Sequence, residues 1–97
     1  MGRPGADEPG GENLGQEILD KLSAAVTAGA DPTGEAGQEI TALHRRWLNV
    51  MGDKYDARRQ RGLAELYVQD ERFTAYYDRE TPGCARFLRD AVLHWAD

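Results

Sequence analysis

The sequence is poor in cysteine and has no long hydrophobic run. Its 97 residues contain a single cysteine, Cys84. No disulfide can therefore form within the chain, which suits a reducing cytoplasm. No apolar stretch approaches the roughly 20 residues of a membrane-spanning helix, and the N-terminus lacks the hydrophobic core of a secretory signal. These absences exclude a disulfide-stapled scaffold and a membrane-embedded chain, and they predict a cytoplasmic location.

Basic residues are outnumbered. The 12 lysines and arginines face 17 acidic residues, which gives a formal net charge of −5. Binding to a phosphate backbone needs a basic field, so direct contact with nucleic acid is not expected. The arginines do form two local groups, Arg45-Arg46 and Arg58-Arg59 with Arg61. We interpret these groups as a solvated face, with an acidic partner or a sister domain as the alternative.

No catalytic arrangement is visible. The sequence has no Ser-His-Asp order, no glycine-rich phosphate loop and no His-Glu-x-x-His motif, and no carboxylate is paired with an apolar setting that would tune an acid. The two histidines, His44 and His94, lie far apart in the chain and outside any cysteine cluster, which argues against a metal site. We therefore expect a protein that binds rather than catalyses, with no cofactor and no metal.

The composition divides the chain into a short leader and one domain. Residues 1–12 contain glycine, proline and acid but almost nothing that could form a core, as is typical of a disordered leader or linker. Residues 13–97 suffice for one small domain, and apolar residues recur there at helical spacing. Because no stretch alternates with a period of two, the sequence predicts an all-α fold, a bundle of about five short helices around one core.

Two helices are predicted in the first half of the domain. The first extends over residues 14–28, has an apolar residue at every fourth position, and ends at Gly29. The second starts at Asp31-Pro32, a capping residue followed by proline at the first helical position. Its expected buried face consists of Ile40, Leu43, His44, Trp47 and Met51.

Three further helices are predicted in the second half. Asp53 is the expected cap of a helix over residues 54–68, Asp70 caps a short fourth helix, and a fifth opens at residues 81–82 and extends to Trp95. The fourth helix carries three aromatic residues at i, i+3 and i+4: Phe73, Tyr76 and Tyr77. The two adjacent tyrosines are not expected to point inward together.

A set of spaced motifs in the second half is distinctive. In chain order they are Leu63-Ala-Glu-Leu-Tyr-Val-Gln-Asp-Glu-Arg-Phe73, Tyr76-Tyr77-Asp78, Pro82-Gly83 and Phe87-Leu-Arg-Asp-Ala-Val92. This set resembles the antibiotic-recognition domain of TipA-type bacterial regulators. The usual pattern there is a Leu-Gly-Glu-Met-Tyr-Val-x-Asp-x-Arg-Phe run, a Pro-Gly helix start and a closing Arg-Asp-Ala-Ile. The resemblance extends over residues 14–96 and includes the upstream His44-Arg45 pair.

The resemblance implies both a fold and a ligand class. It implies a globin-like helical domain without haem that binds bulky, mostly apolar, heterocycle-rich antibiotics such as thiopeptides or albicidin. In the family this domain usually follows a MerR-type DNA-binding domain. The chain is therefore expected to be the effector domain of a transcriptional regulator or a stand-alone resistance protein that sequesters the drug, and its oligomeric state is left open.

One feature of the family pattern is absent. Thiopeptide-binding members trap the drug through a cysteine just before the Leu-Gly-Glu-Met run, and Gly62 occupies that position here. The lone thiol, Cys84, is expected in the first turn of a helix, where the dipole lowers thiol pKa values. Its neighbours Phe87 and Leu88 favour a small core residue instead. Non-covalent binding is therefore the expectation.

The aromatic residues suggest where a ligand would bind. Eight aromatics are generous for so small a core, and flat rings suit flat heterocycles. Three of them are assigned to the core: Phe73, Phe87 and Trp95. The candidate ligand-binding residues are His44, Trp47, Met51, Tyr55, Gly62, Leu66, Tyr67 and Tyr76. The alternatives are a satisfied core histidine at His44, close helix packing at Gly62, and a protein-interaction module that kept the fold without a pocket.

Overall fold

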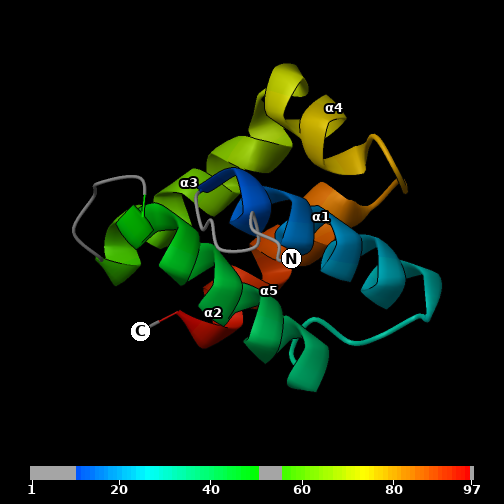
Figure 1. Ribbon diagram of the computed structural model, residues 1–97. Helices are drawn as coiled ribbons and strands as arrows, with labels where there is room; N and C mark the ends of the chain where they lie inside the picture. The colour runs from blue at the N-terminus through cyan, green and yellow to red at the C-terminus, as the bar shows by residue number, and fades with distance from the viewer. Residues whose placement is uncertain (1–10, 51–55, 97) are drawn as a thin grey trace, which may run out of the picture.

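The computed structural model describes residues 11–50 and 56–96, and these residues form five α-helices (Figure 1). In chain order the helices are α1 (Gly11–Thr27), α2 (Glu35–Val50), α3 (Ala57–Gln69), α4 (Glu71–Asp78) and α5 (Cys84–Trp95). The prediction of an all-α bundle of about five short helices is confirmed, and the described residues contain no strand. Within this part of the chain, no helix has the length and apolar character needed to cross a membrane.

Side-chain caps set the starts of α3 and α4. Asp56 accepts a hydrogen bond from the backbone N–H of Arg58, and Asp70 accepts one from that of Arg72, each at 2.9 Å. Each carboxylate thereby satisfies one of the amides that a first turn leaves free. The capping role predicted for Asp70 is confirmed. The predicted cap of α3, Asp53, lies outside the described residues, and Asp56 is the cap observed.

The predicted start of the second helix at Asp31-Pro32 is wrong, because α2 begins at Glu35. The Asp31 carboxylate accepts hydrogen bonds at 2.9 Å from both the backbone N–H and the hydroxyl of Thr33, so it closes a local turn instead of capping a helix. These two bonds hold the pKa of Asp31 below its usual range. The first helix begins earlier than predicted, at Gly11.

The fifth helix begins at Cys84, later than the predicted start at residues 81–82. Gly83, just before it, has a φ of 99°, in the left-handed region that favours glycine. Asp78 accepts a hydrogen bond from the backbone N–H of Ala85 at 2.8 Å. The end of α4 thereby supplies a carboxylate to the first turn of α5, where the helix dipole favours negative charge.

The carbonyl oxygen of Pro32 anchors the loop between α1 and α2. A Cβ atom at Gly37 would lie 1.7 Å from this oxygen, so the approach is possible only at a glycine. Trp95 Nε1 donates a hydrogen bond to the same oxygen at 3.2 Å. The loop is therefore tied both to α2 and to the end of α5.

Helix α5 is the centre of the bundle. It packs against each of the other four helices, and in Figure 1 it lies enclosed among them in orange to red. The core draws on all five helices, with buried members that include Ile18, Leu22, Ile40, Leu43, Ala64, Tyr67, Tyr77, Phe87, Leu88 and Val92.

The predicted buried face of the second helix is largely confirmed. Ile40, Leu43 and His44 are buried, and Trp47 is half-buried against the core. Met51 lies outside the described residues. Helix α2 therefore turns this face toward α1 and α5, its two main neighbours.

Three aromatics were assigned to the core. The structure buries one of them, places a second at the edge of the core and leaves the third outside it. Phe87 is buried, and Trp95 is half-buried against the core. Phe73 is 37% exposed and does not belong to the core. The reason is that Tyr77 takes the inward position of α4 at 7% exposure, while its neighbour Tyr76 stays 43% exposed, as expected for adjacent helical positions.

Candidate functional site

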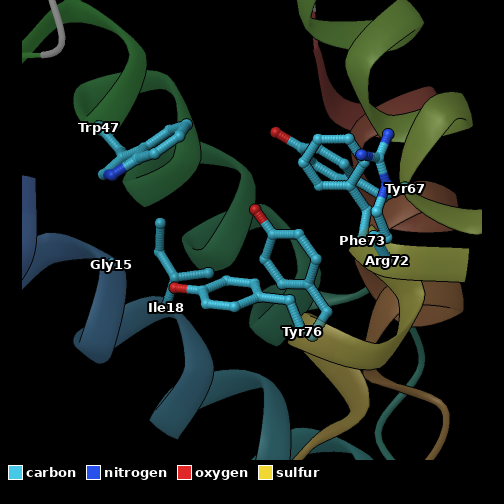
Figure 2. Close-up of a pocket in the computed structure, with 8 residues that line it drawn as sticks. Gly15, Ile18, Trp47, Tyr67, Arg72, Phe73 and Tyr76 are labelled. Atoms are coloured by element: carbon cyan, nitrogen blue, oxygen red, sulfur yellow. The ribbon is translucent and has the colours of Figure 1, made fainter. Parts of the chain in front are cut away.

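An aromatic cavity of about 470 Å³ opens among α1, α2, α3 and α4. Eight described residues line it (Figure 2): Gly15, Ile18, Trp47, Tyr67, Arg72, Phe73, Tyr76 and Tyr77. Five of these eight are aromatic. The volume falls within the range of about 300–1,000 Å³ that is usual for small-molecule sites.

The aromatic wall is organised around Tyr67 of α3. Its ring centroid lies 4.7 Å from that of Tyr77 and 5.5 Å from that of Phe73, and Tyr76 stands edge-on to Tyr77 at 5.0 Å. Such spacings are favourable for aromatic pairs. Phe73 and Tyr76 remain partly exposed, so their rings still have surface to offer to a flat ligand.

Arg72 is the one charged residue among the described lining residues. Its Nη2 lies 3.0 Å from Oδ2 of Asp70, the carboxylate that also caps α4. The hydrogen bonds from Arg72 hold the pKa of Asp70 below its usual range. The positive charge at this wall is therefore already paired, and the cavity is mainly apolar and aromatic.

His44, a predicted site residue, lies behind the cavity wall and does not line the cavity. It is fully buried. Its Nε2 is 3.1 Å from the Tyr67 hydroxyl and its Nδ1 is 2.9 Å from Nε2 of Gln60. Because an amide nitrogen only donates, this network assigns the ring proton to Nε2, which donates to the Tyr67 oxygen. The imidazole also stacks on Trp47, with centroids 6.0 Å apart. His44 thus positions two aromatic rings of the wall.

The charge state of His44 follows from its surroundings. Burial lowers the pKa of His44 to about 4, so the imidazole is neutral at pH 7. A neutral ring is what this network requires, because Nδ1 acts as an acceptor. The interpretation of His44 as a satisfied core histidine therefore describes it better than that of a residue lining the pocket.

Gln60 is a positioning residue that the sequence analysis missed. It is fully buried on α3, and its amide nitrogen also donates to the Thr41 carbonyl at 3.3 Å. Gln60 Oε1 and the Thr41 hydroxyl have no partner among the described residues. Both residues line a smaller cavity of about 190 Å³ beside the end of α5. Its spacing was the available signal, because Gln60 lies four positions before Ala64 and seven before Tyr67, on the buried face of α3.

The structure brings three of the eight predicted ligand-binding residues into the cavity wall: Trp47, Tyr67 and Tyr76. Gly62 and Leu66 are exposed elsewhere on α3. A Cβ atom at Gly62 would meet nothing within 4 Å, so close helix packing does not explain this glycine either. Met51 and Tyr55 lie outside the described residues.

Five lining residues were not predicted: Gly15, Ile18, Arg72, Phe73 and Tyr77. Two signals in the sequence could have indicated some of them. A glycine inside an amphipathic helix, such as Gly15, often marks a close approach or a functional site. The i, i+3, i+4 aromatic spacing of α4 also places three rings on one side of a short helix.

Cys84 lies away from the cavity and is not activated. It is fully buried in the first turn of α5. Burial raises the pKa of Cys84 to about 11, with a smaller contribution from the nearby carboxylates of Asp78 and Glu80. The thiol is therefore protonated at neutral pH and belongs to the core, as its neighbours in the sequence indicated.

Comparison with known proteins relates the chain to bacterial transcription regulators. It is 33% identical over 79 residues to the HTH-type transcriptional activator TipA of Streptomyces coelicolor and, to the same extent, of Streptomyces lividans. This alignment covers 79% of the chain but only 30% of TipA. The HTH-type transcriptional activator mta of Bacillus subtilis is 46% identical over 37 residues, which is 38% of the chain and 14% of mta. No solved structure matches the chain significantly.

The family assignment rests on a longer match. Residues 7–95 match the TipAS antibiotic-recognition domain, which includes every described residue that lines the aromatic cavity. The resemblance noted in the spaced motifs of the second half is therefore confirmed. The chain belongs to the family of TipAS antibiotic-recognition domains.

Proposed function

We propose that this chain binds a bulky, mostly apolar, heterocycle-rich antibiotic of the thiopeptide or albicidin type without forming a covalent bond. The observation that carries the proposal is the cavity of about 470 Å³ with five aromatic residues among its eight described lining residues. Flat rings of a ligand would stack on Trp47, Phe73 and Tyr76, and each such pair contributes about 0.5–1.5 kcal/mol beyond burial. The cavity also supports drug binding over a fold that kept no pocket.

The absence of an activated thiol supports non-covalent capture. Cys84 lies outside the aromatic cavity and is buried and protonated, and Gly62 stands where the family's reactive cysteine is expected. The bound state would then be held by aromatic contacts and hydrogen bonds. Such binding is reversible, and it raises the stability of the fold by mass action.

The relatives support a proposal for the biological role. TipA and mta are HTH-type transcriptional activators, and the chain spans about a third of the length of TipA. We propose that it acts in the cytoplasm as the ligand-sensing part of such a regulator, joined to a MerR-type DNA-binding domain, or that it sequesters the drug alone. In either case its role would be binding and not catalysis.

A ligand panel tests the proposal. Thiopeptides and albicidin are titrated into the chain while its melting temperature and tryptophan fluorescence are recorded. Binding should raise the melting temperature, by an amount equivalent to about 2.7 kcal/mol at a ligand concentration 100 times Kd, and should quench Trp47, which lines the cavity. The Trp47→Phe variant should lose the quenching, because its remaining tryptophan, Trp95, lies outside the cavity. No response to any compound would overturn the proposal.

A further inference from the structure

Two polar atoms of the aromatic cavity converge on the bare surface of α1 at Gly15. A Cβ atom built at Gly15 would lie 3.7 Å from Trp47 Nε1 and 3.8 Å from the hydroxyl oxygen of Tyr76. Figure 2 shows the indole nitrogen of Trp47 and the hydroxyl of Tyr76 both directed toward the α1 side of the cavity. The space that a side chain at this position would fill is thus bordered by a residue from α2 and a residue from α4.

Neither polar atom is engaged within the described part of the chain. Trp47 contacts the His44 ring through its own ring, and Tyr76 contacts Tyr77 and Arg79 in the same way, but no hydrogen bond involves Trp47 Nε1 or Tyr76 Oη among residues 11–50 and 56–96. The other indole of the chain behaves differently. Trp95 Nε1 donates to the Pro32 carbonyl at 3.2 Å.

The chemistry of these atoms defines the group that would complement them. An indole N–H only donates, and a tyrosine hydroxyl both donates and accepts. A ligand atom over Gly15 must therefore be an acceptor to satisfy Trp47. Such an acceptor needs a free lone pair and is therefore unprotonated. The Arg79 guanidinium, 5.1 Å from the centroid of the Tyr76 ring, also disfavours a cationic group near Tyr76.

Glycine at position 15 is costly for the helix but useful for the site. Gly15 lies inside α1, where glycine is a poor helix former compared with alanine. Fold packing does not require it, because an added Cβ would make ordinary contacts of 3.7 and 3.8 Å only with the two cavity residues. What the glycine provides is room for another molecule beside Trp47 and Tyr76.

We propose that Gly15, Trp47 and Tyr76 form a recognition point for an unprotonated hydrogen-bond acceptor of the ligand, such as a heteroaromatic ring nitrogen or an amide carbonyl. The inference rests on the proposed function, since it assigns part of the specificity of the same cavity. It adds that the cavity selects by hydrogen bonding as well as by apolar stacking. Gly15 supplies the space, Trp47 Nε1 the obligatory donor and Tyr76 Oη an adaptable second partner.

The two tryptophans provide a direct spectroscopic test. Protein labelled with ¹⁵N at the indoles is titrated with the thiopeptides and albicidin, and separately with 2-phenylthiazole and 2-phenylthiophene, which have similar shapes but differ in the ring nitrogen acceptor. The Trp47 indole proton should move downfield with 2-phenylthiazole and with any antibiotic that binds. The Trp95 indole signal serves as the internal reference and should stay in place.

Three variants give the recognition point a quantitative test. Tyr76→Phe should weaken binding of 2-phenylthiazole by about two- to tenfold, the usual effect of one neutral hydrogen bond, and should leave 2-phenylthiophene binding within twofold. Gly15→Ala should weaken binding of both fragments, because its methyl group occupies space that either ring would enter. Gly15→Ala should also raise the melting temperature of the free protein, because alanine favours the helix. The matched control is Gly62→Ala, an exposed helical position outside the cavity, which should raise the melting temperature and leave both affinities unchanged.

The outcomes separate this inference from the proposed function. Antibiotic binding with an unmoved Trp47 indole signal, or equal affinity for the two fragments in every variant, overturns the recognition point while drug binding stands. If the Trp47 indole signal shifts with 2-phenylthiazole but not with 2-phenylthiophene, and no antibiotic binds, the recognition point is supported. The proposal that the ligand is a thiopeptide or albicidin is then wrong. If 2-phenylthiazole leaves the Trp47 signal unmoved up to its solubility limit, the inference is wrong whatever the antibiotics do.

Discussion

Nε2 of His44 and the hydroxyl oxygen of Tyr67 lie 3.1 Å apart, and the imidazole is fully buried behind the aromatic cavity. The other ring nitrogen of His44 is bonded to Gln60, so each polar end of the imidazole is satisfied. This arrangement links the polar interior of the bundle to a residue of the cavity wall. The contribution of this hydrogen bond to the stability of the fold and the charge state of His44 can both be tested by experiment.

Removal of the Tyr67 hydroxyl should destabilise the fold. Tyr67→Phe leaves the His44 Nε2–H buried without its acceptor, which is expected to lower the free energy of unfolding by about 1–3 kcal/mol. Urea unfolding followed by circular dichroism measures the change. Tyr76→Phe is the control, because Tyr76 is 43% exposed and its hydroxyl has no bond in the described residues, so it should change stability by no more than about 0.5 kcal/mol.

Stability should fall as the pH drops from about 6.5 to about 4. The folded state holds the pKa of His44 at about 4, whereas the unfolded chain has the ordinary value of about 6.5. In this window the unfolded state binds a proton that the folded state does not, so acid favours unfolding. The loss integrates to about 3 kcal/mol between pH 7 and pH 4. The lowered pKa values of Asp31 and Asp70 act below this window.

The measurement for this pH effect is urea unfolding at a series of pH values. The variant His44→Gln has no titrating ring, so its stability should be nearly flat over the same window even if it is lower throughout. A wild-type curve that stays level between pH 6.5 and pH 4 would show that the buried imidazole does not resist protonation.

Gly37 should tolerate no side chain. A Cβ atom there would lie 1.7 Å from the Pro32 carbonyl oxygen, which also accepts the hydrogen bond from Trp95. Gly37→Ala should therefore lower the free energy of unfolding by about 1–3 kcal/mol or more, as forced overpacking does. Thermal unfolding measures this change in stability. Gly62→Ala is the control, and it should raise the free energy of unfolding by up to about 1 kcal/mol. Equal behaviour of the two variants would contradict the close approach.

Two phenylalanines should separate binding from folding. Phe73 lines the cavity and is 37% exposed, whereas Phe87 is buried in the core at 6%. Phe73→Ala should cost about 1 kcal/mol of stability or less and weaken antibiotic binding about three- to tenfold through the lost ring contact. Phe87→Ala should cost about 3 kcal/mol or more in stability. Calorimetric titration and urea unfolding of both variants check this, and a large loss of stability in Phe73→Ala would place that ring in the core.

Cys84 should react slowly in the native protein. Burial raises its pKa to about 11, so at pH 8 its thiolate fraction is roughly 200-fold below that of a free cysteine with a pKa near 8.5. The rate of reaction with Ellman's reagent, compared between native protein and protein in urea, measures the difference. Rapid modification of the native protein, or a covalent adduct with an added thiopeptide, would contradict a passive core thiol.

Local sequence signals accounted for the helices but not for every start. The apolar residue at every fourth position of α1 and the carboxylate of Asp70 before α4 act over one or two turns, so their consequences were predictable. Asp31-Pro32 carries the same kind of signal, yet its carboxylate bonds to Thr33 in a turn. The Asp31 carboxylate could either cap a helix or close a turn, and both options are local. The turn is the one observed, and in it the Pro32 carbonyl oxygen lies against Gly37.

Predictions for the site were weaker because a cavity wall is assembled from several helices. Trp47, Tyr67 and Tyr76 were identified from their residue type and their motif positions. The contribution of α1 through Gly15, and the support of His44 by Gln60, depend on how α1, α2 and α3 lie against one another. No periodicity within one helix carries that information.

The sequence by itself determined the helical class, the core stripes and the family, because these depend on residue spacing along single helices and on motifs in a fixed order. Only the tertiary structure decided which rings became core and which became wall. Phe73 and Tyr77 lie on the same short helix, yet one stays 37% exposed and the other is buried at 7%. The physical reason is that burial is set by what the neighbouring helices present at each point. Both rings contact Tyr67 of α3, but Tyr77 also packs into the core, whereas Phe73 lies at the edge of the cavity.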